Sequence, residues 1–196
     1  MKRMVFRLFF LVVLILVFGC ASEQEKSVEF LNDAQVSYDA GEYSQAVIQI
    51  KNAIEATPKS LPAHELLAKT YLKLGDARQA FNTLRIIEQL APNDLDNVAQ
   101  VASFYLLGRQ REEAEKRVAR ILNENPDHTQ ALYLKAGLLS GNRDNLEKIE
   151  EIYSRILSLD PNQARAHLAL SRIFMTRNQP EKAEIELKKA LAISPE

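Results

Sequence analysis

The chain has few of the residues that support disulfide frameworks, zinc centres and general nucleic-acid binding. Its 196 residues include one cysteine and three histidines. A single cysteine excludes an intrachain disulfide and a cysteine-rich zinc site. Neither sign of charge is in excess, since 25 Lys and Arg residues balance 26 Asp and Glu residues. Without excess positive charge to displace counterions from phosphates, the composition argues against nucleic-acid binding.

Motifs for catalysis and cofactor binding are absent from the sequence as well. It contains no glycine-rich phosphate loop, no Gly-x-Ser-x-Gly nucleophile motif and no His-Glu-x-x-His zinc motif. His64, His128 and His167 are 64 and 39 residues apart, unlike the short spacings of metal ligands. We therefore expect no enzyme activity, no cofactor and no metal site, with His64 and His167 in structural positions between helices.

The N-terminus has the layout of an export signal. Three basic residues, Lys2, Arg3 and Arg7, precede an unbroken apolar run from Leu8 to Phe18. This run is shorter than the roughly 20 residues needed to span a bilayer, but it suits the hydrophobic region of a signal peptide. An ordinary secretory signal with a chance cysteine and an uncleaved anchor are the alternatives.

Residues 17–20, Val-Phe-Gly-Cys, resemble the lipobox of bacterial lipoproteins. The resemblance implies removal of residues 1–19, a lipid on Cys20 and a tether over residues 20–26. Two or more acyl chains hold a protein stably on a membrane. Because residues 21–22 include no aspartate, the same resemblance favours the periplasmic face of the outer membrane. Loss of the signal leaves 22 basic and 26 acidic residues, a net charge of −4 that does not favour anionic lipid.

Internal repeats dominate the rest of the chain, because five prolines recur at separations of 34, 34, 35 and 34 residues. These prolines are Pro58, Pro92, Pro126, Pro161 and Pro195. Two alanine series share the period, the first being Ala34, Ala68, Ala102 and Ala136 and the second Ala46, Ala80, Ala114 and Ala183. Between them lie residues able to take a left-handed turn: Gly41, Gly75, Gly108, Gly141 and Asn178. We expect each of these residues to end the first helix of its repeat.

Apolar residues at three- and four-residue spacing predict two helices in each repeat, and no stretch shows strand alternation. The pattern resembles the tetratricopeptide repeat, although the tryptophan usual at its fourth position is missing throughout. The resemblance implies an all-α fold, a right-handed α-solenoid of five repeats. The predicted repeats are residues 27–60, 61–94, 95–128, 129–163 and 164–196. An extra residue near the turn of the fourth repeat predicts a local irregularity there.

In this family, side chains from the first helix of each repeat line a concave groove that binds peptides. Counting from the prolines carries these positions onto the present chain. The implied groove residues are Leu31, Gln35, Tyr38, Glu65, Lys69, Leu72, Lys73, Ser103, Leu106, Tyr133, Arg165, Leu168, Arg172 and Met175. The lysine with which chaperone-binding members grip a terminal carboxylate is absent from the fifth position of every repeat. We expect the groove to bind an extended or helical segment of a partner protein, with a merely solvated surface as the alternative.

Together these features predict a membrane-anchored scaffold or adaptor that binds a partner protein in envelope assembly or secretion. A structural subunit of a polysaccharide-export or pilus-type machine is the alternative. Residues 41–80 resemble the repeat lipoproteins associated with exosortase (PEP-CTERM) and extracellular polysaccharide systems. The chain stops at Glu196 without a polar capping helix. We therefore expect a longer repeat array, or self-association that covers the edge of the fifth repeat.

Overall fold

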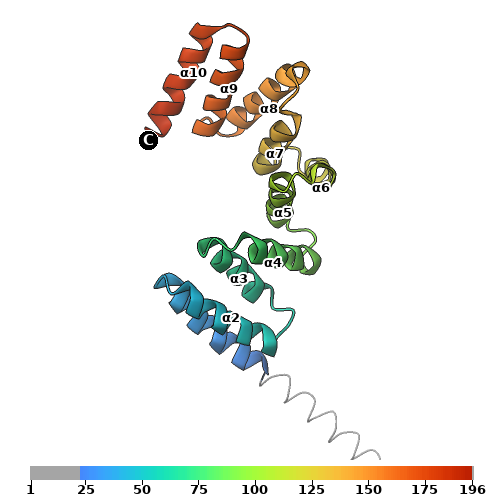
Figure 1. Ribbon diagram of the computed structural model, residues 1–196, viewed down its shortest axis with the longest axis vertical. Coiled ribbons are helices and arrows are strands. Elements are labelled where there is room, and N and C mark those ends of the chain that lie inside the picture. Colours follow the sequence, from blue (N-terminus) through green and yellow to red (C-terminus); the bar gives the residue numbers. More distant parts are fainter. Residues whose placement is uncertain (1–22, 196) are drawn as a thin grey trace, which may run out of the picture. The chain divides into compact units, whose positions relative to one another are not determined.

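The computed structural model describes residues 23–195, which form helices joined by short turns (Figure 1). A first helix covers residues 23–39. It is followed by α2 (Tyr43–Ala56), α3 (Leu61–Lys73), α4 (Ala77–Leu90), α5 (Leu95–Leu107), α6 (Arg111–Glu124), α7 (Thr129–Leu139), the 3-10 helix η1 (Arg143–Asn145), α8 (Leu146–Leu159), α9 (Ala164–Thr176) and α10 (Pro180–Ile193). No strand occurs in this range, so the predicted all-α fold class is confirmed.

The chain forms two compact units that divide after Asn93. In the first unit, α3 packs against both α2 and α4. The helix over residues 23–39 is joined to α2 by the Ser27 hydroxyl, which donates to the Ala53 carbonyl at 2.8 Å. Residues 23–26, predicted as part of the tether, are helical, and a Glu23–Lys26 ion pair of 3.1 Å spans this first turn. The predicted signal peptide and Cys20 lie outside the described residues.

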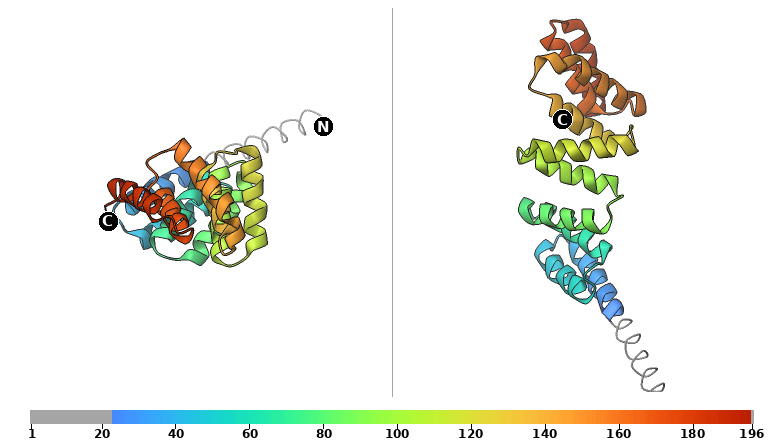
Figure 2. Two further views of the ribbon diagram at one scale, coloured as in Figure 1. Left: turned by 90° about the horizontal axis from the view of Figure 1, so that it is seen from above. Right: turned by 90° about the vertical axis from the view of Figure 1, so that its right-hand side faces the viewer.

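The second unit contains α5 to α10, and each helix packs against the next along the chain. The views in Figure 2 show such pairs side by side, most clearly α9 with α10. One apolar cluster joins α5, α6 and α7 through residues such as Val98, Val118 and Leu134. A second joins α7, α8 and α9 through Leu132, Ile156 and others. The unit therefore has a continuous core of its own.

Buried alanines let the two helices of each pair approach closely. The members of the two series are Ala34, Ala46, Ala68, Ala80, Ala102, Ala114, Ala136 and Ala183, and each is at most 3% exposed. A larger side chain at such a crossing would push the helix axes apart. The prolines of the first turns, Pro62 and Pro180, add no cost because their missing N–H groups would have no intrahelical partner.

The predicted left-handed turns are confirmed at four of the five positions. Gly41, Gly75 and Gly141 have φ of +79°, +73° and +99°, and Asn178 has +55°. Gly108 ends α5 as its C-cap, as expected, but its φ is −75° and the left-handed residue is the next one, Arg109, at +59°. The N–H of Arg109 bonds to the Leu106 carbonyl as that of Gly75 bonds to Leu72. In the third repeat the turn therefore keeps the position equivalent to Gly75 rather than that of the available glycine.

The extra residue of the fourth repeat is accommodated by η1, which separates α7 from α8. The Asn142 side chain accepts a hydrogen bond from the Asp144 N–H at 3.0 Å and so starts this turn. The Asn145 amide donates to the Leu139 carbonyl at 3.1 Å and ties the turn to the end of α7. The irregularity is therefore local. The exact boundaries of the five repeats stay a prediction.

Candidate functional site

A groove of about 790 Å³ lies in the second unit along α5, α7 and the start of α9. Its lining residues are Asp96, Ser103, Leu106, Leu107, Asn125, Asp127, His128, Thr129, Gln130, Tyr133, Leu134 and Arg165. Four of the predicted groove residues are among them: Ser103, Leu106, Tyr133 and Arg165. The first helices of the third, fourth and fifth repeats thus bring part of the predicted set together.

Tyr133 and Arg165 form an ordered pair at the α9 end of this groove. The guanidinium of Arg165 stacks over the Tyr133 ring, 4.4 Å from its centroid. The Tyr133 hydroxyl donates to the Gln163 side-chain oxygen at 3.3 Å, and the Gln163 amide donates to the Asp160 carboxylate at 2.6 Å. Burial raises the pKa of Tyr133, opposed by the positive charge of Arg165. The ring is therefore neutral at physiological pH and presents a fixed, cation-covered aromatic face.

A second tyrosine from α8 extends this aromatic cluster. The ring centroid of Tyr153 lies 6.0 Å from that of Tyr133. Burial raises the pKa of Tyr153, and the charges of Arg165 and Arg172 act against that rise. Nearby, hydrogen bonds from the Asn162 N–H and the Gln163 amide hold the pKa of Asp160 below its ordinary value. Tyr133 and Arg165, which line the α9 end of the groove, are thus joined by Tyr153 and Arg172, which lie outside its lining.

Acidic and apolar side chains line the remainder of the groove. The Nε2 atom of His128 lies 3.3 Å from the Asp96 carboxylate, while its Nδ1 accepts the Ala131 N–H at 3.4 Å and caps α7. Arg155 holds Asp127 through two bonds of 2.8 and 2.7 Å. Leu107, which also lines the groove, is 80% exposed. An exposed leucine in a groove with polar groups is a natural contact for an apolar side chain of a ligand.

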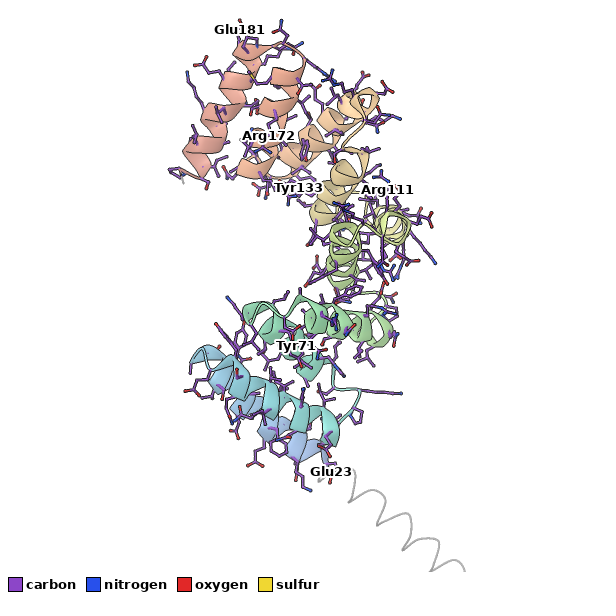
Figure 3. All side chains as sticks on the ribbon, viewed as in Figure 1. Glu23, Tyr71, Arg111, Tyr133, Arg172 and Glu181 are labelled. Carbon is purple, nitrogen blue, oxygen red and sulfur yellow. The ribbon has the colours of Figure 1, made fainter. Side chains whose placement is uncertain are left out.

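The other predicted residues of the second unit lie on α9 but do not line the groove. Leu168, Arg172 and Met175 are exposed along one side of that helix. Figure 3 labels Arg172 on α9 and Tyr133 on α7. These residues extend the exposed surface of α9 away from Arg165.

In the first unit the predicted residues lie on two helices. Leu31, Gln35 and Tyr38 belong to the helix over residues 23–39, where Gln35 donates to Asp39 at 2.9 Å and the Tyr38 ring contacts Tyr43. Glu65, Lys69, Leu72 and Lys73 belong to α3, and all but the half-buried Glu65 are exposed. A hollow of about 550 Å³ in this unit is lined by residues 41–45 and Leu74, and it includes none of them.

Sequence reasoning missed the contribution of the connection between α6 and α7. Asn125, Asp127 and His128 of this connection line the groove together with Asp96 at the start of α5. The predicted groove positions all lie within the first helix of each repeat. Residues of a connecting turn were therefore not among the candidates. The available clue was His128, whose position just before the fourth repeat's first helix suits an N-cap.

The histidines of the second and fifth repeats have the predicted structural role. The Nε2 atoms of His64 and His167 each lie 3.0 Å from a carbonyl, that of Pro58 or Pro161, at the preceding turn. Both side chains are buried. Within residues 23–195, no group of three His, Cys, Asp or Glu side chains is arranged to hold a metal ion.

Two family models match parts of the chain. Residues 14–87 match the family described as anaphase-promoting complex, cyclosome, subunit 3, and residues 150–196 match a tetratricopeptide-repeat model.

Solved structures of repeat proteins share the fold over most of the chain. MamA from Desulfovibrio magneticus RS-1 is 19% identical with a TM-score of 0.71, covering 87% of this chain and 96% of that one. YrrB, described as a TPR protein with an unusual peptide-binding site, is 17% identical with a TM-score of 0.65 and 92% coverage of both chains. These likenesses confirm the predicted fold, an α-solenoid of tetratricopeptide repeats.

Curated relatives are matched only over a small share of their own length. The mouse protein O-mannosyl-transferase TMTC3 is 24% identical over 151 residues, which are 77% of this chain but 14% of that protein. The type IV pilus assembly protein PilF of Pseudomonas aeruginosa is 36% identical over 66 residues, 34% of this chain and 26% of PilF. The likeness is thus one of repeat segments.

Proposed function

We propose that the protein is a scaffold that binds an extended or helical segment of a partner protein through the groove of its second unit. The observation that carries this proposal is the open groove itself, which is lined by the exposed Arg165 and Leu107 and by the buried Tyr133 ring on which Arg165 stacks. Aromatic and arginine side chains at the centre of a surface are typical anchors of protein interfaces. The peptide-binding site named for YrrB, a protein of the same fold, supports a peptide ligand.

The residues of the groove favour binding over catalysis. Its acidic groups are engaged, Asp127 by Arg155 and Asp96 by His128, and its tyrosines are neutral. No nucleophile lies beside a general base among the lining residues. A surface of hydroxyl, amide and apolar groups instead suits the backbone and side chains of a peptide. We propose a role without enzyme activity.

We propose further that Cys20 carries a lipid and holds the scaffold on the periplasmic face of the bacterial outer membrane. The lipobox-like residues 17–20 support this anchor. In the described range no helix is both long and apolar enough to cross a bilayer. We expect cells to incorporate labelled palmitate into the wild-type protein and not into a Cys20→Ala variant. Equal labelling of both proteins would contradict the anchor.

Envelope assembly or secretion is the proposed setting, and the likeness to PilF favours a second candidate, a structural subunit of a pilus-type machine. A polysaccharide-export machine is a related setting suggested by residues 41–80. Self-association through the fifth repeat stays a prediction, and α10 exposes Ile185, Leu187 and Leu191 that such a contact would cover. A dedicated adaptor and a machine subunit differ in stoichiometry, because a subunit copurifies in fixed ratio with an assembly.

Photocrosslinking from inside the groove tests the proposed function. A photoreactive phenylalanine analogue placed at Leu107, which is 80% exposed, should give a discrete adduct in intact cells. The matched control is the same analogue at Ile48 on α2, which is 56% exposed and outside the groove. Equal adduct patterns from both positions, or none from Leu107, would contradict a ligand in the groove.

A further inference from the structure

We infer that α9 gives the groove a docking face for an acidic segment of the partner protein, with two carboxylates about 10 Å apart and an apolar side chain between them. The inference rests on the proposed function, because it names the chemistry of the segment that the groove binds. The α9 docking face consists of Arg165, Leu168, Arg172 and Met175.

The four residues form one continuous stripe. They are separated by three, four and three positions, which places them on the same side of an α-helix. Leu168 is 37% exposed and Met175 is 61% exposed. The rest of the helix is mostly turned inward, with Ala166, His167, Leu170, Ser171 and Ile173 all buried. The outer face of α9 is therefore made of two cations alternating with two flexible apolar side chains.

The positive charge of this face has no internal counterion in the described part of the chain. The segment of α9, ARAHLALSRIFMT, contains no aspartate or glutamate. Other arginines of the same unit are paired, Arg155 with Asp127 and Arg177 with Glu150. Neither Arg165 nor Arg172 makes an ion pair with a carboxylate within residues 23–195. A partner carboxylate can therefore bind either guanidinium without displacing an existing salt bridge.

The two guanidinium groups also lie near the aromatic cluster of Tyr133 and Tyr153. Arg165 stacks on Tyr133 at 4.4 Å, and the charges of both arginines act on the Tyr153 hydroxyl of α8. Stacking on a ring removes rotamer freedom from Arg165 before any ligand arrives. A preorganised guanidinium loses less conformational entropy on binding than a free one. The α9 docking face is thus joined to the groove at Arg165.

The spacing of the arginines selects the geometry of the ligand. Seven residues of α-helix rise about 10.5 Å. In a polyproline II segment, which has three residues per turn and rises about 3.1 Å per residue, side chains three positions apart lie on the same edge about 9 Å apart. A Glu-x-x-Glu segment in that conformation therefore matches both arginines, with an intervening apolar residue beside Leu168. Long polyanions fit poorly, because basic and acidic residues balance over the whole chain at 25 and 26.

Peptides of defined charge test the docking face on the full chain in detergent. The probe is a fluorophore-labelled Ser-Glu-Leu-Leu-Glu-Ser peptide, followed by fluorescence polarisation. Its matched controls replace both glutamates by glutamine or by lysine. Exposed ion pairs contribute up to about 1 kcal/mol each, so loss of one should weaken binding by about fivefold. We expect that weakening from Arg172→Gln and from Arg165→Gln, and further weakening with added salt.

Arg143→Gln provides the matched protein control, because Arg143 is an exposed arginine of the same unit in η1, away from α9. It should bind the glutamate peptide as the wild type does, and helical circular dichroism should be unchanged in all three variants. Equal binding of the glutamate and glutamine peptides, tighter binding of the lysine peptide, or unchanged binding by Arg172→Gln would overturn the inference. A Leu107 crosslink that persists beside such a result leaves the proposed function standing and rejects only the acidic ligand. If Leu107 gives no crosslink but the glutamate peptide binds and Arg172→Gln weakens that binding, the proposed partner groove is rejected and the docking face is supported.

Discussion

At the scale of single residues, the corner between the two helices of a repeat requires one residue with a positive φ. Gly75 meets this requirement in the second repeat, and its Cβ position is open space. In the third repeat the same position holds Arg109, one residue after the available glycine. A left-handed conformation costs a residue with a side chain about 1–2 kcal/mol relative to glycine. The third repeat therefore contains a strained corner that its packing maintains.

We predict that Arg109→Gly raises the free energy of unfolding by about 0.5–1 kcal/mol, since relief of the strain exceeds the added freedom of the unfolded chain. Gly75→Ala should lower it by about 1 kcal/mol, because alanine would have to adopt a φ of +73°. Urea unfolding followed by circular dichroism measures both changes. A destabilised Arg109→Gly would show that the arginine side chain, rather than the backbone, matters at this corner.

At the scale of elements, His64 and His167 hold the same position on the first helix of their repeats but make different contacts. His64 and His167 both bond to a carbonyl of the preceding turn through Nε2. The Nδ1 of His167 also contacts the Glu186 carboxylate at 2.5 Å and links α9 to α10, whereas the buried Nδ1 of His64 has no hydrogen-bond partner. Burial raises the pKa of Glu186, but hydrogen bonds from Lys189 and His167 outweigh it and leave the pKa lowered.

The lowered pKa of Glu186 predicts an acid-sensitive contact between α9 and α10. A carboxyl whose pKa is lower in the folded state stabilises the fold above its unfolded pKa of about 4.3, and this stabilisation is lost as pH falls through the folded pKa. Glu186→Gln should cost about 1 kcal/mol at pH 7. The free energy of unfolding of this variant should also fall less than that of the wild type between about pH 5 and pH 3, a range that includes the unfolded pKa of about 4.3.

Urea unfolding across this pH range provides the measurement. Glu181→Gln is the matched control, because Glu181 lies in the exposed first turn of the same helix. Its pH dependence should follow the wild type. Parallel curves for Glu186→Gln and the wild type would show that the His167–Glu186 contact does not contribute to the acid dependence.

The helices were predictable from the sequence because their signals are local. Apolar spacing, alanines at the crossings and prolines after each second helix all act within one repeat, and Ala46 and Ala114 are fully buried as this pattern requires. The lining of the groove was only partly predictable. Tyr133 and Arg165 follow from repeat positions, whereas Asp96 and His128 meet through the fold of a connecting turn. No periodicity encodes such a contact.

At the scale of the whole molecule, the second unit has a core of its own. The clusters around Val98 and Ile156 are formed entirely by residues of α5 to α9. Repeat arrays are stabilised by contacts between neighbouring repeats, and three repeats suffice for a stable array. Residues 94–196 hold the groove, the aromatic cluster and the α9 docking face together.

We predict that residues 94–196 fold without the first unit. The isolated fragment should show helical circular dichroism, melt cooperatively and bind the glutamate peptide with the affinity of the full chain. The fragment with Ile156→Asp is the control, because a buried charge in the second cluster should unfold it. A fragment that is unfolded in native buffer would show that the first unit is needed for its stability.

Within the second unit, the packing of each helix on the next along the chain also determines how fast the unit forms. Such contacts close only short loops, and proteins with low contact order fold in microseconds to milliseconds. The α9–α10 pair spans residues 164–193, so both of its helices can meet once this short stretch of chain is free. The helices from α5 to α10 can therefore pack one after another during synthesis, each against the helix made before it.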